Sequence, residues 1–497
     1  MRWLLPAVVA SGLVTSCAIL RPAAPLPPLT AVQRDGTFTR EDARADLDTL
    51  LALVDEVHPN PYSIVTRDSL RRAEAALIAE LPPTFGRLRL GTQAQRLVAL
   101  VGDGHTSIYP PGDELLNALA LGKTTLPFSV VHTERGWTIG NSLDANVHAG
   151  DRIVRINGGD IDSLMRVFAQ EIPAELEPWR VSRLGSSFAS RLFAHDIRAP
   201  FQVEALRGDR SLHFTLPGAT RAQLDSANKA RASVTQNVAG LAYRALPGRV
   251  AYLDFQTMIQ DESQFRHAAD SIFDRINADS STGLVIDLRR NGGGNSSRGD
   301  DLLTYLTDTP YVTVSKKEWK MSRRYRQQIA SQVVWWLHAV PFSWFGHIGH
   351  EMFGGPDGKI AVLADSETTR PAANPRRVVR PVCVLIGPGT FSSAMLFANV
   401  IKQNHLATLI GEPTGEPPNS FGEVYGFRLP LSGLQGQVST ARWTLDRAPD
   451  GDRRGVLPDV ATTRTAVDVE AGRDPALERA IACGTADGVT RTRPERR

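Results

Sequence analysis

The stretch that decides the fold covers residues 380–415 and reads RPVCVLIGPGTFSSAMLFANVIKQNHLATLIGEPTG. Val382–Ile386 is a short apolar run rich in β-branched residues, which predicts a buried strand. Apolar residues then recur at helical spacing from Ser392 to Gln403, and Ala407–Ile410 predicts a second strand. The stretch therefore predicts a β-α-β unit with a serine at the start of its helix.

That serine has two interpretations. A serine on a strand-to-helix turn exposes its hydroxyl beside the free N–H groups of the helix start, which suits a nucleophile next to half of an oxyanion hole. The alternative is an ordinary helix N-cap, for which Thr390 and Ser392 fit equally well. The unit alone does not decide between them.

Three other motifs bear on the choice: VGDGHT at 101–106, GLVIDLRRNGGG at 283–294 and GEPTG at 411–415. Together with TFSSA they resemble the C-terminal processing (tail-specific) peptidase family of serine hydrolases. The resemblance is to the branch related to the tricorn protease core and interphotoreceptor retinoid-binding protein. It implies an α/β fold: a crotonase/ClpP-like parallel-sheet protease core, an N-terminal helical domain and an inserted PDZ-like β domain.

The chain has 497 residues, of which 42% are hydrophobic, so it can bury more than one core. Thr39 and Asp42 can cap the first of several helices, and strands alternate with helices from Gly248 onward, which predicts a largely parallel sheet. The stretch AGDRIVRINGG at 149–159 resembles the late strand of a PDZ domain. The predicted divisions begin with a lipoprotein signal peptide at 1–16 and a Pro/Ala-rich tether at 17–36. A helical domain at 37–117, which ends in the DGHT motif, and a PDZ-like domain at 118–218 follow. The peptidase core covers 219–497 and contains residues 313–378, which we interpret as a packed insertion or a lid.

The N-terminal segment Met1–Ser16 has one basic residue, an apolar centre and small residues at its end, as a secretory signal does. Val14 to Cys17 resembles the bacterial lipobox, which implies that Cys17 is lipidated. A lipoprotein anchored to a membrane of the bacterial cell envelope and facing the periplasm follows from this, with an ordinary signal peptide as the alternative. Cys383 and Cys483 can pair in such an oxidising compartment or remain free thiols, and the sequence leaves both open.

Several classes of function are disfavoured. The net charge of +3 is small and the basic residues are scattered, so nucleic-acid binding is not expected. Neither phosphate-binding glycine motif occurs, and the histidines at 347–351 do not form HExxH. We expect no metal and no cofactor.

A serine hydroxyl needs a base to act as a nucleophile. Much of the family uses a lysine 25 residues after the serine, but Pro417 holds that position and no lysine follows Lys402. The resemblance therefore implies the tricorn-like arrangement, in which His105 of the DGHT motif is the general base. Histidine suits this task because its ordinary pKa lies near neutrality.

The resemblance also implies an acid that orients the histidine. In this branch a glutamate precedes the G-V-x-P-D turn by three residues, and counting back from Gly455 leads to Asp452. Asp450 and Glu423 remain alternatives. The oxyanion hole would combine the N–H of Ser393 with an N–H of the glycine turn, at Gly292 or Gly293.

The resulting hypothesis is a serine peptidase that hydrolyses peptide bonds through an acyl-enzyme. Its site is a Ser392, His105 and Asp452 triad rather than a Ser–Lys dyad, and its substrates are peptides or unfolded proteins. A non-catalytic binding protein on the same scaffold, for a hydrophobic ligand or a peptide, is the alternative. The sequence leaves the oligomeric state open.

Overall fold

The computed structural model describes residues 27–110, 112–232, 236–238, 240–332, 355–363, 368–449 and 451–485. These residues form two compact units. The predicted signal peptide, Cys17, the aromatic stretch at 333–353 and Asp450 lie outside the described residues. Within the described ranges, no helix combines the length and the apolar character needed to cross a bilayer.

The larger unit comprises residues 110–314, 366–419 and 445–497. Its main sheet has seven strands in the order β10-β11-β12-β13-β16-β17-β20. The first three strands pair antiparallel, and all neighbours from β12 to β20 are parallel. The strands are β10 (Gln236–Val238), β11 (Leu241–Leu246), β12 (Val250–Phe255), β13 (Gly283–Asp287), β16 (Val382–Ile386), β17 (Thr408–Gly411) and β20 (Val460–Ala461).

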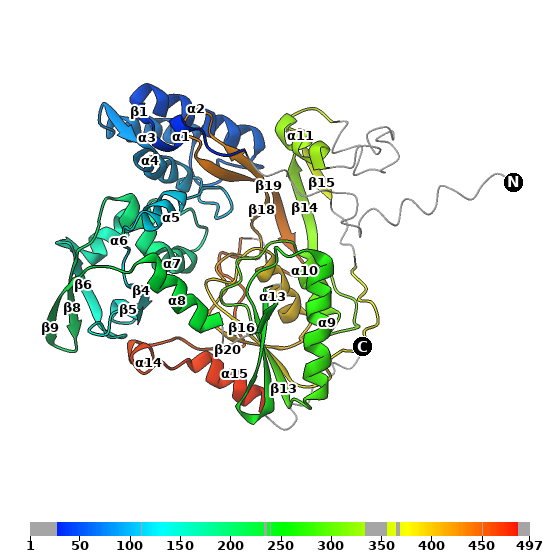
Figure 1. Cartoon of the computed structure of the whole chain (residues 1–497). Helices are drawn as coiled ribbons and strands as arrows, with labels where there is room; N and C mark the ends of the chain where they lie inside the picture. The colour runs from blue at the N-terminus through cyan, green and yellow to red at the C-terminus, as the bar shows by residue number, and fades with distance from the viewer. Residues whose placement is uncertain are drawn as a thin grey trace. The chain divides into compact units, whose positions relative to one another are not determined.

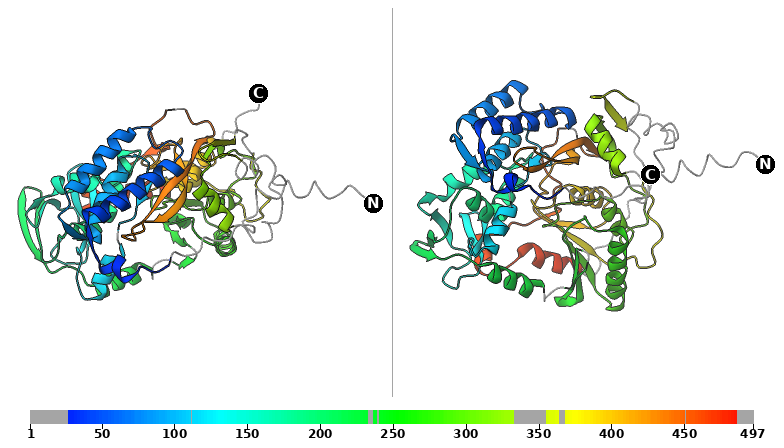
Figure 2. Two further views of the ribbon diagram at one scale, coloured as in Figure 1. Left: turned by 90° about the horizontal axis from the view of Figure 1, so that it is seen from above. Right: turned by 45° about the horizontal axis from the view of Figure 1, so that its top comes forward.

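Helices cover both faces of this sheet, which explains why every residue of β12, β13 and β16 is buried. α9 (Glu262–Ala278) and α15 (Pro475–Thr485) lie on opposite sides of it (Figures 1 and 2). Phe265 of α9 packs against Phe255, with ring centroids 5.5 Å apart. Cys383 of β16 forms a disulfide with Cys483 of α15, which resolves the pairing left open by the sequence. The larger unit also contains α8 (Arg221–Ala232), η1 (Pro247–Arg249), α10 (Ser297–Leu303), α13 (Ser393–Gln403) and α14 (Ala466–Glu470).

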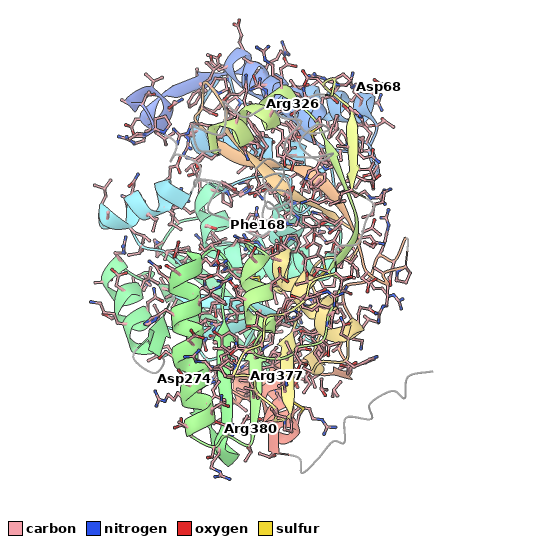
Figure 3. All side chains as sticks on the ribbon, turned by 90° about the vertical axis from the view of Figure 1, so that its right-hand side faces the viewer. Asp68, Phe168, Asp274, Arg326, Arg377 and Arg380 are labelled. Carbon is pink, nitrogen blue, oxygen red and sulfur yellow. A yellow bond between two sulfur atoms is a disulfide. The ribbon has the colours of Figure 1, made fainter. Side chains whose placement is uncertain are left out.

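A second sheet in the larger unit is antiparallel, in the order β4-β5-β6-β8-β9, with the short β7 beside β6. Helices α6 (Ile161–Ala169) and α7 (Glu177–Ala194) supply its core. Phe168 of α6, which Figure 3 labels, is fully buried and packs against Phe188 of α7 at 6.0 Å between ring centroids. The other elements are α5 (Gly112–Ala120), β4 (Phe128–Thr133), β5 (Gly136–Ser142), β6 (Arg152–Ile156), β7 (Gly159–Asp160), β8 (Phe201–Arg207) and β9 (Arg210–Leu216). The stretch at 149–159 that was predicted to contain a strand forms β6 and the start of β7, whereas α7 was not predicted.

The smaller unit comprises residues up to Tyr109, Ser315–Asp365 and Ser420–Thr444. Helices form in its N-terminal part, and the predicted capping box between Thr39 and Asp42 is present. The helices are α1 (Ala31–Asp35), α2 (Arg40–Val57), α3 (Arg67–Ala79) and α4 (Arg87–Ala99), with a small sheet of β1 (Thr37–Thr39) and β2 (Thr84–Gly86).

A second sheet of the smaller unit joins segments that are far apart in the sequence. Its order is β15-β14-β19-β18, with β3 also paired to β19. The strands are β3 (Ser107–Ile108), β14 (Val314–Lys320), β15 (Ile360–Leu363), β18 (Phe421–Arg428) and β19 (Gln435–Leu445), and α11 (Arg323–Gln332) follows β14. Because β3 directly follows the DGHT motif, this sheet places that motif against β19.

Candidate active site

Ser392 lies between β16 and α13, in the larger unit, and its backbone is strained. Its φ is 55° and its ψ is −130°. A non-glycine residue adopts such angles at a cost of about 1–3 kcal/mol, and such residues persist only where the surroundings enforce them. A sharp strand-to-helix turn of this kind is how hydrolases expose a nucleophilic serine.

Contacts from two other motifs hold this turn. The N–H of Ser392 donates to Oε2 of Glu416 at 2.7 Å, and Glu416 is 1% exposed. The N–H of Gly415 donates to the carbonyl of Thr390 at 3.0 Å, and the Thr390 hydroxyl donates to the carbonyl of Leu288 at 2.9 Å. TFSSA, GEPTG and DLRRNGGG therefore meet at the carboxyl ends of β13, β16 and β17.

The glycine turn after β13 lies against the serine turn. Gly293 has a φ of 92°, and a Cβ on it would lie 2.7 Å from Cβ of Ser392. Since any larger residue would push the serine away, this position requires glycine. The N–H of Gly293 donates to Oδ1 of Asn291 at 2.9 Å, so that group is already used.

Two of the three predicted oxyanion donors remain for a substrate. In the part of the chain that the structure describes, no hydrogen bond uses the N–H of Gly292 or of Ser393. Gly292 is exposed, and Ser393 is the first residue of α13. The hydroxyl of Ser393 donates to the carbonyl of Gly294 at 2.7 Å, which leaves that serine to contribute through its backbone.

Asp452, the predicted orienting acid, is partly exposed and forms an ion pair with Arg454 at 2.9 Å. Hydrogen bonds from Arg454 lower the pKa of Asp452 below its ordinary value. The structure thus describes an ionised carboxylate with one arginine partner. The role of Asp452 as the acid stays a prediction.

His105 lies in the smaller unit, in a turn that its own motif stabilises. The N–H of Thr106 donates to the carbonyl of Asp103 at 3.1 Å, and the N–H of His105 donates to Oδ1 of Asp103 at 2.9 Å. An aspartate at the first position of a turn commonly bonds the backbone two residues on. His105 is 7% exposed, and its Nδ1 lies 3.9 Å from Oδ1 of Asp103.

Asp103 is a buried carboxylate that the sequence reasoning did not assign. Its Oδ2 accepts from Nε2 of His58 at 3.1 Å, from the Thr106 hydroxyl at 2.6 Å and from the Ser439 hydroxyl at 2.5 Å. His58 opens the stretch HPNPY at 58–62, directly after the end of α2. The sequence signals for the contact between His58 and Asp103 were a histidine at the end of a helix and an aspartate two residues before His105.

The other candidate groups are engaged elsewhere. Glu423 accepts from Lys317 and, at 2.6 Å, from Nε1 of Trp319, all within the smaller unit. Lys402 forms an ion pair with Asp459 at the surface of the larger unit. These contacts give both side chains structural partners.

Residues 249–462 match the model of peptidase family S41. Mature CPAF has a similar fold, with 15% identity, a TM-score of 0.61 and coverage of 90% of this chain and 97% of that chain. A mutant of CPAF has 14% identity and a TM-score of 0.63, and the match covers 91% of this chain and 99% of that chain. Mature CPAF complexed with lactacystin has 15% identity and a TM-score of 0.59, and the match covers 90% of this chain and 98% of that chain. At these identities the structures show the fold alone, and none of the curated proteins matches.

The family match covers the glycine turn and the strained serine, so the resemblance predicted from the motifs is confirmed: this chain carries a peptidase family S41 region at residues 249–462.

Proposed function

We propose that this chain is a serine peptidase that cleaves peptide bonds in peptides or unfolded proteins through an acyl-enzyme. The observation that carries the proposal is the strained turn at Ser392, with the N–H groups of Ser393 and Gly292 beside it. A turn that costs free energy and presents a hydroxyl next to two backbone donors fits acyl transfer, which needs a nucleophile and an oxyanion hole at one place.

In the proposed reaction the Ser392 hydroxyl attacks the scissile carbonyl while His105 accepts its proton. The N–H groups of Ser393 and Gly292 stabilise the oxyanion of the tetrahedral intermediate. His105 then donates the proton to the leaving amine, and a water molecule hydrolyses the acyl-enzyme with His105 again as the base. Asp452 is the predicted third member, and the Ser–Lys dyad is disfavoured because Pro417 replaces the lysine.

The test is hydrolysis of an unfolded protein such as casein, with the new termini identified by mass spectrometry. Wild-type protein should produce new termini, whereas folded Ser392→Ala protein should produce none. The same spectra show whether cuts fall inside the chain or near its C-terminus. Absence of cleavage by folded wild-type protein would contradict the proposal and favour a non-catalytic binding protein on this scaffold.

We also propose the finer architecture that the resemblance implies, a crotonase/ClpP-like core and a PDZ-like module. The parallel sheet from β12 to β20 supports the first. The antiparallel sheet with α6 and α7, which includes the AGDRIVRINGG stretch in β6 and β7, supports the second. PDZ domains bind a chain end as an added strand beside a carboxylate-binding loop, but no GLGF-like loop precedes this stretch, so we do not propose tail capture.

The proposed location is a membrane of the bacterial cell envelope, facing the periplasm, through a lipid on Cys17. The lipobox resemblance supports it, and the disulfide between Cys383 and Cys483 fits an oxidising compartment. Cys17→Ser should move the protein from the membrane fraction to the soluble fraction. Unchanged fractionation, with no acyl chain in the intact mass of the wild type, would contradict the anchor.

A further inference from the structure

The HPNPY motif places a buried imidazole in the smaller unit. His58 follows α2 directly, in an extended conformation with φ −68° and ψ 133°, because the prolines on either side of Asn60 do not continue the helix. The His58 side chain is fully buried, and its ring lies 4.5 Å from the ring of Phe421 of β18. A buried polar ring needs hydrogen-bond partners on both of its nitrogens.

Both nitrogens of His58 have such partners, and the partners define the tautomer. The N–H of Asn60 donates to Nδ1 at 3.0 Å, so Nδ1 carries no proton. The proton therefore sits on Nε2, which donates to Oδ2 of Asp103 at 3.1 Å. The proline-bounded turn thus fixes the tautomer and aims a donor at one carboxylate oxygen.

The two oxygens of Asp103 have different tasks. Oδ2 accepts three side-chain donors, from His58, Thr106 and Ser439. Oδ1 faces His105: it accepts the backbone N–H at 2.9 Å and lies 3.9 Å from the ring nitrogen Nδ1. The donors on Oδ2 fix the orientation of the carboxylate. In this orientation Oδ1 lies beside the imidazole of His105.

Asp103 keeps its charge in this position. Burial by itself raises the pKa of Asp103, but hydrogen bonds from His58 and Ser439 and the charge of His105 outweigh it and hold this pKa well below its ordinary value. A buried carboxylate without such donors would be strongly disfavoured. Among the described residues of this unit, two titratable side chains interact with Asp103: His58, directly after α2, and His105, on the DGHT turn.

We propose that His58 is a positioning residue for His105 and acts through Asp103. His58 holds the Asp103 carboxylate in place, and the charge of that carboxylate stabilises the imidazolium that forms when His105 accepts a proton. His58 and Asp103 transfer no atom. The proton taken from Ser392 stays on His105 until it reaches the leaving amine. The inference rests on the proposed function only for the role of His105 as the base.

The experiment follows the titration of His105 by NMR in Ser392→Ala protein with ring-labelled histidine. The chain has 11 histidines, and the His105 signal is the one that His105→Gln removes. Asp103→Asn should move the midpoint of His105 to lower pH, because the carboxylate that favours the charged ring is gone. His58→Phe, which leaves the carboxylate but removes its donor, should move it in the same direction by less.

Kinetics with intact Ser392 separate positioning from folding. His58→Phe should lower kcat about tenfold with little change in KM, the size expected for one hydrogen bond to a charged group. His58→Gln keeps a donor near the place of Nε2 and should recover most of the loss. Equal thermal unfolding of the two variants excludes a folding defect as the cause of their difference.

His195 is the matched control, because its Nε2 bonds a buried carboxylate, Glu171, at 2.5 Å in the larger unit. His195→Gln should leave the His105 midpoint in place. An unchanged midpoint in both Asp103→Asn and His58→Phe would overturn the inference, as would an equal shift in His195→Gln. If the midpoint moves as expected but wild-type protein hydrolyses nothing, the positioning pair is supported and the proposed function fails.

Discussion

At Ser392 the backbone conformation depends on residues that the sequence places far from it. The motif TFSSA identifies the serine, but its φ of 55° follows from the bond to Glu416 and from the close approach of Gly293. Glu416 lies 24 residues after Ser392 and Gly293 lies 99 residues before it, so no local pattern predicts these contacts. For the same reason Asp103 and His58 were missed: a single polar residue in a turn signals a partner only once its neighbours are known.

Gly293 and Gly292 offer a matched pair of substitutions. Gly293→Ala should reduce the rate by at least about 10²-fold, because a Cβ there would lie 2.7 Å from Cβ of Ser392 and displace the nucleophile. Gly292→Ala should be mild, since a Cβ at that position meets nothing within 4 Å and the N–H is kept. The effect of each substitution is measured as the rate at which a fluorophosphonate labels the protein. Equal rates in the two variants would show that the glycine turn does not support the serine.

The identity of the base determines the pH dependence. A histidine base acts only after it loses its proton, so kcat/KM should rise with pH through one ionisation near neutrality. His105→Ala should lose several orders of magnitude, and Asp452→Asn should lose about 10³–10⁴-fold if that residue holds the tautomer. Lys402→Ala should change little, because Lys402 pairs with Asp459. Full activity in His105→Ala would overturn the mechanism.

At the scale of elements, the sequence predicted strands better than some helices. β16 has the predicted bounds, and β17 lies one residue later than predicted, because buried β-branched runs are strong local signals. Helix α7 was missed since its sequence, with one glycine and four serines, has weak helix propensity. Its stripe of Leu184, Phe188 and Leu192 is buried, so tertiary packing stabilises this helix.

Helix α7 also contacts the nucleophile turn. Trp179 stacks on Phe391, the residue before Ser392, with ring centroids 4.1 Å apart and planes at 14°. Trp179→Ala should therefore lower kcat about tenfold or more, because Phe391 loses the surface that holds it. The matched control is Trp137→Ala in β5: Trp137 is 6% exposed and lies in the core of the antiparallel sheet. That variant should lower the unfolding temperature and leave kcat near the wild-type value, whereas equal kcat values in both variants would exclude a role for α7.

At the scale of the whole molecule, the connectivity of the smaller unit was beyond sequence reasoning. Strands β18 and β19 follow the nucleophile unit in the chain and were expected with the peptidase core, yet they belong to the unit that carries His105. Pairing of β19 with β3 depends on contacts between residues more than 300 positions apart in the sequence. Local periodicity contains no information about strand pairing at that separation. The predicted domain boundaries stay a prediction.

The disulfide should contribute to the stability of the larger unit. Cys383 and Cys483 are 100 residues apart, and closing a loop of this length restricts the unfolded chain. Replacing both cysteines by serine should lower the free energy of unfolding by about 2–5 kcal/mol. Urea unfolding measures this, and wild-type protein unfolded with a reductant should match the variant. A reductant that leaves the wild-type midpoint unchanged would show that the bond does not form.

The most direct test of the central claim is to locate the covalent adduct of a fluorophosphonate probe by mass spectrometry. The proposed mechanism predicts one adduct, on Ser392, which is lost in Ser392→Ala, strongly slowed in His105→Ala and retained in Ser393→Ala, because Ser393 acts through its backbone N–H. An adduct on Ser393, or folded wild-type protein that carries none, would contradict the assignment of Ser392 as the nucleophile.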